Sequence, residues 1–247
     1  MRLKKIIKQL EGKFPLELAE EWDNVGLLLD STRREIKSIM LCLDITRDDV
    51  DKAVANKVDL IISHHPFIFS PLKKITTDEV NGEKILKLAR NNIAVYSMHT
   101  NIDSGIGGLN DFIIKKIGQE GKVFVISDNR CVELRKLVTG DLIDAKDKII
   151  NPLRIQKLKS AITIEELCKI IKEKLCIPNV RVVGDTVKLV KSYAICTGSG
   201  MSFSGNVKKK ADVFITGDLK YHESLDASEL NQTIDRKSTR LNSSHLL

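Results

Sequence analysis

The sequence predicts an α/β fold in which helices cover the faces of a mainly parallel or mixed β-sheet. Over the first 120 residues, short apolar runs typical of buried strands alternate with amphipathic helical runs. In addition, 42% of the 247 residues are hydrophobic, which is enough for a sizeable core. The five cysteines are scattered and form no C-x-x-C pair, so a disulfide scaffold or zinc finger is not expected. Reduced thiols instead indicate a cytoplasmic protein.

The first half of the chain gives the clearer pattern. It opens with a helix, because Leu3, Ile6, Ile7, Leu10 and Phe14 recur at helical spacing. Strands and helices then alternate, as parallel sheets require. The expected elements are strands at 37–44, 59–64 and 93–99, and helices at 47–56, 82–92 and 107–118.

The second half is less regular, and a domain boundary is expected near residues 119–122. Helices are predicted at 164–175, with Thr163 as N-cap, and at 221–230. The predicted strands are 122–127, 133–138, 180–184, 190–196 and a last buried strand within 208–218.

The charge distribution allows two interpretations. The net charge of +7 falls on residues 121–247, because residues 1–120 carry equal numbers of acidic and basic side chains. Such a basic half could attract phosphate or nucleic acid. The basic residues are not interleaved with aromatic ones, however, so a solvated lysine-rich surface is favoured. No apolar run is long enough to span a membrane, and the N-terminus lacks a signal-peptide pattern.

Polar residues gather where the predicted strands end. These clusters are Asp44, His64-His65-Pro66, His99 to Asp103, and Thr216-Gly217-Asp218. In open α/β sheets, ligands bind outside the carboxyl ends of the strands. The clusters therefore predict a functional site at that edge.

His64, His65 and Asp103 are the candidate metal ligands. Two imidazoles and a carboxylate suit Zn²⁺, Mn²⁺, Fe²⁺ or Co²⁺, and adjacent imidazoles can serve the two ions of a closely spaced pair. Both imidazoles can face one site only where the backbone turns, and Pro66 marks such a turn. The alternative is an ordinary turn whose histidines bond to the backbone. His99 is a candidate acid or base, or a group that orients Asp103.

Three further segments carry polar residues without a decisive pattern. The loop at 21–29 holds Trp22, Asp23 and Asn24, either as part of a site or as a turn with a packing tryptophan. The glycine turn at 197–202 offers backbone N–H groups to an anion but matches no P-loop. Asp218 and His222 are either site residues or a helix cap and a surface side chain.

Taken together, the motifs EWDNVGL, LIISHHP, YSMHTNID, VRVVGD, CTGSG and DVFITGDLKYH resemble those of the NGG-interacting-factor-like proteins. These proteins are also known as type 2 GTP cyclohydrolase I homologues and dinuclear-metal hexameric proteins. The resemblance covers about residues 1–234. It implies two intertwined α/β domains, here 1–120 completed by about 212–234, and a smaller domain at 121–211. It also implies a ring-shaped homohexamer and two divalent metal ions per chain, with ligands that match His64, His65 and Asp103.

The C-terminal segment departs from this family. The family's G-H-x-x-x-E motif, which supplies a further histidine and glutamate, is expected after the YH helix and is absent. Residues 235–247 resemble instead the translation of a sequencing adapter, so we expect a non-native tail, a truncated protein and weak or incomplete metal binding.

The favoured function is a metal-dependent hydrolase, GTP cyclohydrolase-like by its family, that acts on a nucleotide or phosphoester. The alternative is a non-catalytic metal-binding ring or scaffold, which stores or delivers metal or binds a regulatory protein. A nucleic-acid partner has weaker support, and no membrane partner is expected.

Overall fold

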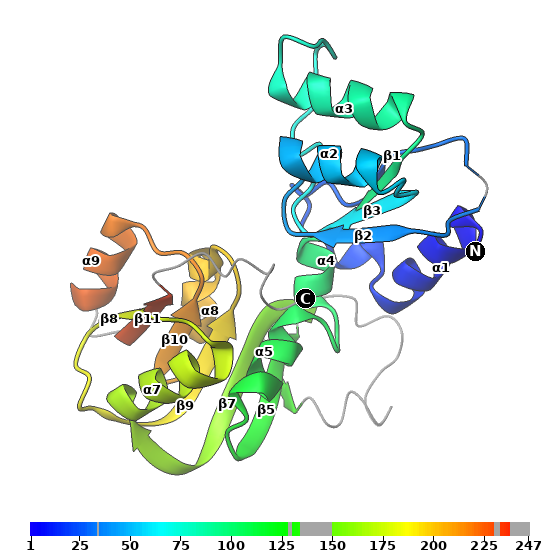
Figure 1. The fold of residues 1–247 in the computed structure, drawn as a ribbon. Coiled ribbons are helices and arrows are strands. Elements are labelled where there is room, and N and C mark those ends of the chain that lie inside the picture. Colours follow the sequence, from blue (N-terminus) through cyan, green and yellow to red (C-terminus); the bar gives the residue numbers. More distant parts are fainter. Residues whose placement is uncertain (34, 128–129, 134–149, 230–232, 238–247) are drawn as a thin grey trace. The chain divides into compact units, whose positions relative to one another are not determined.

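The computed structural model shows an α/β fold and describes residues 1–33, 35–127, 130–133, 150–229 and 233–237 (Figure 1). The chain forms two compact units, which divide between Ile102 and Asp103. Each unit contains one sheet. Among the described residues, none of the helices has the length and apolar character that crossing a membrane requires.

The first unit contains a four-stranded sheet. Its strands are β1 (Gly26–Leu29), β2 (Ile39–Cys42), β3 (Leu60–Ser63) and β4 (Ala94–Ser97). They lie in the order β1-β4-β3-β2. The last three run parallel, with Leu60 opposite both Ile39 and Ala94 in register, whereas β1 pairs antiparallel with β4. The carboxyl ends of three strands therefore meet at one edge.

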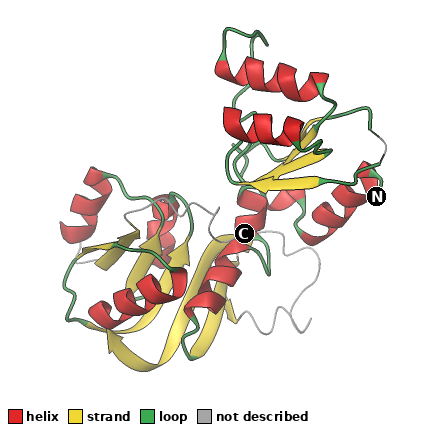
Figure 2. Cartoon of the chain, viewed as in Figure 1, coloured by secondary structure: helices red, strands yellow, loops and turns green. Residues whose placement is uncertain are grey.

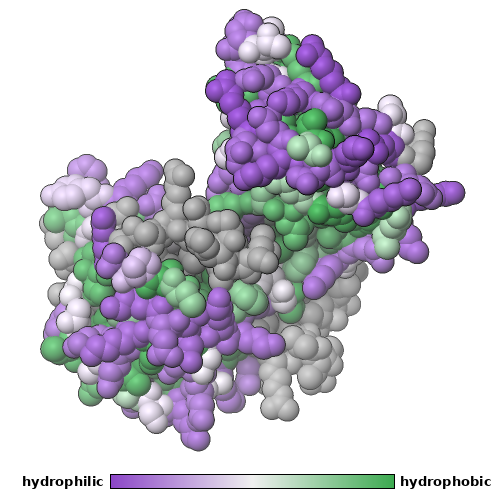
Figure 3. All heavy atoms as spheres, in the orientation of Figure 1, coloured by the Kyte–Doolittle hydropathy of each residue, from purple (hydrophilic) through white to green (hydrophobic). Residues whose placement is uncertain are grey.

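Helices cover both faces of this sheet because its central strands are apolar on both sides. The helices are α1 (Leu3–Lys13), α2 (Arg47–Ala55) and α3 (Val80–Arg90). On one face, Ile61 packs with residues of α2 and α3, and on the other Leu60 packs with residues of α1. Figure 2 shows α2 and α3 together on one side of the strands. Their outward surfaces are mostly hydrophilic (Figure 3), as amphipathic helices require.

The second unit contains a seven-stranded mixed sheet in the order β6-β5-β7-β9-β10-β11-β8. Strands β9, β10 and β11 are parallel to one another, and the other pairings are antiparallel. The bounds are β5 (Gly121–Ser127), β6 (Arg130–Glu133), β7 (Ile150–Thr163), β8 (Val180–Val183), β9 (Leu189–Cys196), β10 (Val213–Thr216) and β11 (Thr233–Lys237).

The described part of the second unit includes the helices α5 (Leu109–Ile117), α7 (Ile164–Leu175), α8 (Ser204–Val207) and α9 (Tyr221–Glu229). Thr163 caps α7 as expected, in a reciprocal capping box with Glu166. Ile117 of α5 and Ile171 of α7 are fully buried and pack on the sheet in one apolar cluster. Short helix α4 (Thr100–Ser104) contains the boundary between the units.

The observed division differs from the expected boundary near residues 119–122. The reason is that α5 buries its apolar face against α7 and the second sheet. Likewise, β10 pairs with β9 and β11, so residues 213–216 lie in the second unit rather than completing the first. The intertwining of the two domains stays a prediction.

Most expected elements match observed ones, but three strands are additional. The sequence analysis did not anticipate β1, β7 or β11, and β11 extends into the expected tail through Lys237. Of the strand expected at 133–138, residues 134–138 lie outside the described residues, as do residues 238–247 of the tail.

A buried carboxylate fixes the start of the parallel pairing. Asp59 precedes β3 and accepts hydrogen bonds from the Lys37 and Ser38 amides at 2.8 and 3.0 Å. It also forms an ion pair with Arg33. Burial acts to raise the pKa of Asp59, but the two amides and the charge of Arg33 lower it below the ordinary value.

We therefore predict that Asp59→Ala destabilises the first unit by about 2–3 kcal/mol at pH 7, because the partly buried hydrogen bonds from the Lys37 and Ser38 amides lose their charged acceptor. The lowered pKa means that this stabilisation is complete above about pH 5 and is lost as the pH falls through the folded-state value. Urea unfolding at several pH values measures both effects. Asp51→Ala is the control, because the Asp51–Lys87 pair is exposed, and it should cost less than about 1 kcal/mol. A cost for Asp59→Ala that is equally small, or does not decrease in acid, would contradict the prediction.

Candidate metal centre

Parallel pairing continues beyond the end of β3 and fixes the two adjacent histidines. The His64 amide donates to the Cys42 carbonyl at 3.1 Å, and the His65 amide donates to Leu43 at 2.9 Å. On the other side, the Met98 amide donates to the Ser63 carbonyl at 2.9 Å. The backbone of the pair is thus held between the ends of β2 and β4.

A turn brings both imidazoles to the same side. Adjacent side chains on a strand point in opposite directions, so a straight continuation would separate them. Here the Ser63 hydroxyl lies 2.8 Å from both the His65 carbonyl, to which it donates, and the Ser97 hydroxyl. The centroids of the His64 and His65 rings are consequently only 5.2 Å apart.

His99, which follows β4, completes a cluster of three imidazoles. Its ring centroid lies 5.1 Å from that of His64 and 5.5 Å from that of His65. One nitrogen from each ring can serve as a ligand atom, and these three atoms lie within 4.8 Å of one another. We refer to His64, His65 and His99 as the histidine cluster.

Each ring of the histidine cluster uses its Nδ1 atom to bind an oxygen of the protein. The Nδ1 of His64 lies 2.9 Å from the Met98 carbonyl oxygen, which can only accept, so this nitrogen carries the proton. The Nδ1 of His65 lies 2.8 Å from Asp44, and that of His99 lies 3.0 Å from Asp23. In the neutral form of each ring, the same assignment leaves Nε2 with its lone pair available.

Asp23 is a buried, negatively charged support for His99. Its side chain is fully buried, and it accepts hydrogen bonds from the amide and hydroxyl of Thr100 as well as from His99. Burial acts to raise the pKa of Asp23, but these hydrogen bonds and the charge of His99 lower it to about 2. Asp23 is therefore ionised at neutral pH.

His64 is kept neutral by its surroundings. Burial lowers the pKa of His64 to about 3, and the charges of His99 and His65 act in the same direction. Hydrogen bonding to Met98 opposes this effect without cancelling it. A neutral imidazole is the form that binds a metal ion.

Two exposed aromatic rings lie next to the cluster. The Trp22 ring is 6.1 Å from that of His99 and 6.0 Å from that of Phe69. Trp22 is 60% exposed and Phe69 is 54% exposed, so neither is a core residue. Trp22 therefore packs against the rings of Phe69 and His99 rather than in the core, and its part in a site stays a prediction.

The sequence that forms this cluster matches a known protein family. The family model described as Duf34/NIF3 (NGG1p interacting factor 3) matches residues 1–235. The chain belongs to the Duf34/NIF3 family.

Individual relatives support this assignment. The chain is 35% identical over 232 residues to a "GTP cyclohydrolase 1 type 2 homolog" of Clostridium acetobutylicum, covering 94% of this chain and 81% of the relative. It is 34% identical to "NIF3-like protein 1" of Drosophila melanogaster, covering 94% and 75%. Among solved structures, a Bacillus cereus protein related to NIF3 superposes with a TM-score of 0.79 at 26% identity, covering 96% and 87%.

Within this Duf34/NIF3 chain, the expected site residues fall into two groups. His64, His65 and His99 converge in the first unit. Asp103 is buried and begins the second unit, where its carbonyl accepts a hydrogen bond from Asn110 at 3.1 Å. The convergence of Asp103 on the histidine pair stays a prediction. Asp218 and His222 also lie in the second unit, where Asp218 accepts a hydrogen bond from the Leu219 amide and His222 lies in the first turn of α9.

Asp23 was expected in a loop and Asp44 at the end of a strand, but neither was paired with a histidine from the sequence. Asp23 lies 76 positions before His99, so local spacing carries no signal for this contact. The contact of Asp44 with His65 could have been predicted, because Asp44 follows β2, and β2 pairs in parallel with the strand that leads to His65.

We predict that the neutral form of each of the three histidines in the metal-free protein is the Nδ1–H tautomer, because each Nδ1 binds an oxygen. Long-range ¹H–¹⁵N correlation spectra distinguish the two nitrogens of each ring. His64 should also stay neutral when the pH is lowered to about 5, since its pKa is about 3. An Nε2–H tautomer at any of the three positions would disagree with the hydrogen bonds described above.

Proposed function

We propose that the chain is a metal-dependent hydrolase that acts on a nucleotide or another phosphoester at the histidine cluster. The observation that carries this proposal is the convergence of three imidazoles whose Nδ1 atoms are all occupied by oxygen acceptors. Metal-binding histidines in proteins characteristically donate their second N–H to a carboxylate or carbonyl in this way. An ordinary histidine turn has no need for two such carboxylates.

The donors fit a borderline divalent ion. Neutral imidazole nitrogens suit Zn²⁺, Fe²⁺, Mn²⁺ and Co²⁺, and the rings of His64 and His65, with centroids 5.2 Å apart, supply two of them on one side of the strand end. The wider proposal, which rests on the family resemblance, is two ions per chain with Asp103 as a further ligand. It also includes a cytoplasmic homohexamer.

When bound, such an ion supplies an acidified water and a positive charge for the developing negative charge at phosphorus or carbon. The protein's own residues then have separate tasks. His64 and His65 provide the ligands, and Met98 and Asp44 hold their rings in place. The exposed ring of Trp22 flanks the cluster on the His99 side.

His99 is the proposed proton carrier. Its Nδ1–H is held by the ionised Asp23, which fixes the ring and stabilises the imidazolium that forms when Nε2 accepts a proton. The side chain of His99 is 18% exposed, so its proton can exchange with solvent.

The names of the relatives support a nucleotide as one possible substrate. The bacterial relative is called a GTP cyclohydrolase 1 type 2 homologue, and hydrolysis at the purine ring or at a phosphoester both require an activated water. Assays therefore include GTP and a model phosphodiester.

We predict that His64→Ala lowers metal affinity severely, because it removes a buried ligand. Asp44→Asn should lower metal affinity about 10- to 100-fold, because it removes only the support of His65. The measurements are metal content by elemental analysis and affinity by competition with a chelator. Asp51→Asn, an exposed carboxylate paired with Lys87, serves as the control and should bind metal like the wild type.

Unchanged metal binding in His64→Ala would refute the metal centre. A wild-type protein that binds metal fully but hydrolyses neither substrate would instead support the non-catalytic ring or scaffold.

For His99→Ala, we predict that metal content is retained while turnover falls about 10²- to 10⁴-fold, the usual contribution of a positioned acid or base. Steady-state kinetics on the metal-loaded protein, with elemental analysis of the same samples, tests this. Parallel loss of metal and activity would make His99 a third ligand rather than a proton carrier.

A further inference from the structure

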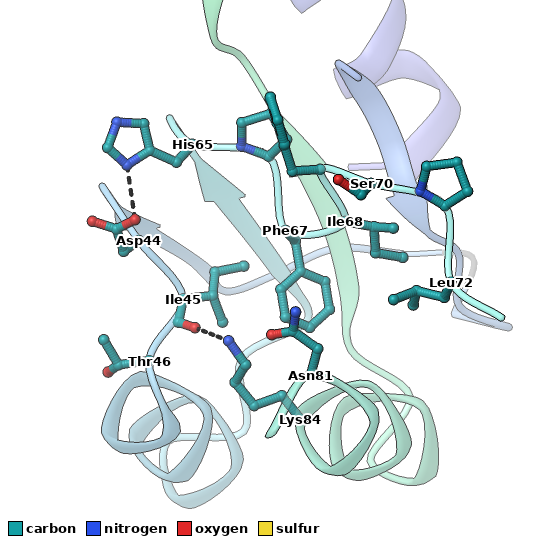
Figure 4. Close-up of a pocket in the computed structure, with 13 residues that line it drawn as sticks. Asp44, Ile45, Thr46, His65, Phe67, Ile68, Ser70, Leu72, Asn81 and Lys84 are labelled. Carbon is teal, nitrogen blue, oxygen red and sulfur yellow. Dashed lines mark hydrogen bonds and ion pairs between the residues drawn. The ribbon is translucent and has the colours of Figure 1, made fainter. Parts of the chain in front are cut away.

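A cavity of about 450 Å³ lies directly beside the histidine cluster, within the first unit. Asp44 and His65 line it on one side, and the segment that continues from His65 to Leu72 lines it as well. The floor is formed by the start of α3, from which Asn81 and Lys84 point into the cavity (Figure 4). The proposed ligand His65 is therefore one of the residues that line this cavity.

Lys84 is the unusual residue of this cavity. Its ammonium donates a hydrogen bond to the Ile45 carbonyl at 2.8 Å and lies 5.5 Å from the centre of the Phe67 ring. Lys84 is half-buried, and this burial lowers the pKa of its ammonium. An ammonium has three donors, and a single carbonyl uses only one of them.

Neighbouring cations are paired with carboxylates, but Lys84 is not. Arg47 pairs with Glu83, and Lys87 pairs with Asp51. Within the described part of the chain, no carboxylate lies within 4.0 Å of the Lys84 ammonium. Asp44 and Asp49 act on it only at longer range, and Asp44 is already bound to His65.

We propose that this cavity is the subsite for a phosphate group of the substrate, with Lys84 as its cation. The inference rests on the proposed hydrolase function, because it places the phosphate in a cavity that the ligand His65 also lines. A partly desolvated ammonium without a carboxylate partner gains most from an anion. The amide of Asn81 lies beside Lys84 and supplies a neutral donor (Figure 4). The cavity volume also exceeds that of one phosphate, which leaves room for the rest of a nucleotide.

The experiment measures inorganic phosphate binding to the full chain without metal, in the presence of a chelator. Isothermal titration calorimetry or chemical shift changes at Lys84 follow the binding. Wild-type protein should bind phosphate, Lys84→Gln should bind at least ten-fold more weakly, and Lys84→Arg should remain within a few-fold. Lys87→Gln is the matched control on the same helix and should bind as the wild type does.

A second variant keeps the test decisive if Lys84→Gln does not fold. Asn81 is exposed, so Asn81→Asp should fold normally, and its added negative charge should weaken phosphate binding at least five-fold. The proposal is overturned if the wild type does not bind phosphate, or if Lys84→Gln and Asn81→Asp bind it as well as the wild type.

Because binding is measured without metal or turnover, it is independent of whether the protein is a hydrolase. If the wild type hydrolyses a phosphoester, Lys84→Gln should raise KM about ten-fold with a smaller change in kcat, as loss of substrate binding requires. A normal KM in Lys84→Gln would place the substrate's phosphate elsewhere even if hydrolysis is confirmed.

Discussion

The parallel pairing of β2, β3 and β4 is the constraint on which the candidate site depends. It brings the ends of three strands to one edge, and it continues through the His64 and His65 amides after β3 has ended. The buried Asp59 fixes the opposite end of the same pairing by binding the amides that lead into β2. A shift of one residue between β2 and β3 would turn the histidine pair away from Asp44 and remove the support of His65.

The polar side chains of Asp23 and His64 can be wholly or partly buried in the site because each forms hydrogen bonds with a suitable partner. Asp23 is fully buried, yet it is surrounded by donors from Thr100 and His99, which is why it remains ionised. His64, in contrast, is kept in its neutral form: the Met98 carbonyl holds its ring, and burial keeps the imidazole uncharged. The three rings thus form a preorganised set in which little rearrangement is needed for metal binding.

The alternation of strands and helices was sufficient to predict the fold class and most elements of the first unit. It did not reveal β7, because the charged residues Arg154, Lys157 and Lys159 interrupt its apolar pattern. Arg154 is nevertheless fully buried, since it pairs with Asp111 and donates to the Ser104 carbonyl. The histidine pair was recognisable from its position after a strand, whereas the contacts of His65 with Asp44 and of His99 with Asp23 span 21 and 76 residues.

The position of the cavity at Lys84 bears on which of the proposed substrates can react at the histidine cluster. The residues that form it come from the turn after β2, the loop after His65 and the first turns of α3, so the same parallel pairing positions both the histidine cluster and the cation. A phosphate bound at Lys84 would place the adjoining part of the substrate at His65, which favours reaction at or near the phosphoester. Attack on a purine ring would instead require the phosphate to extend away from the cluster. Comparing Lys84→Gln in assays with GTP and with a small phosphodiester therefore separates these two chemistries, because only the substrate that uses the cavity should lose affinity.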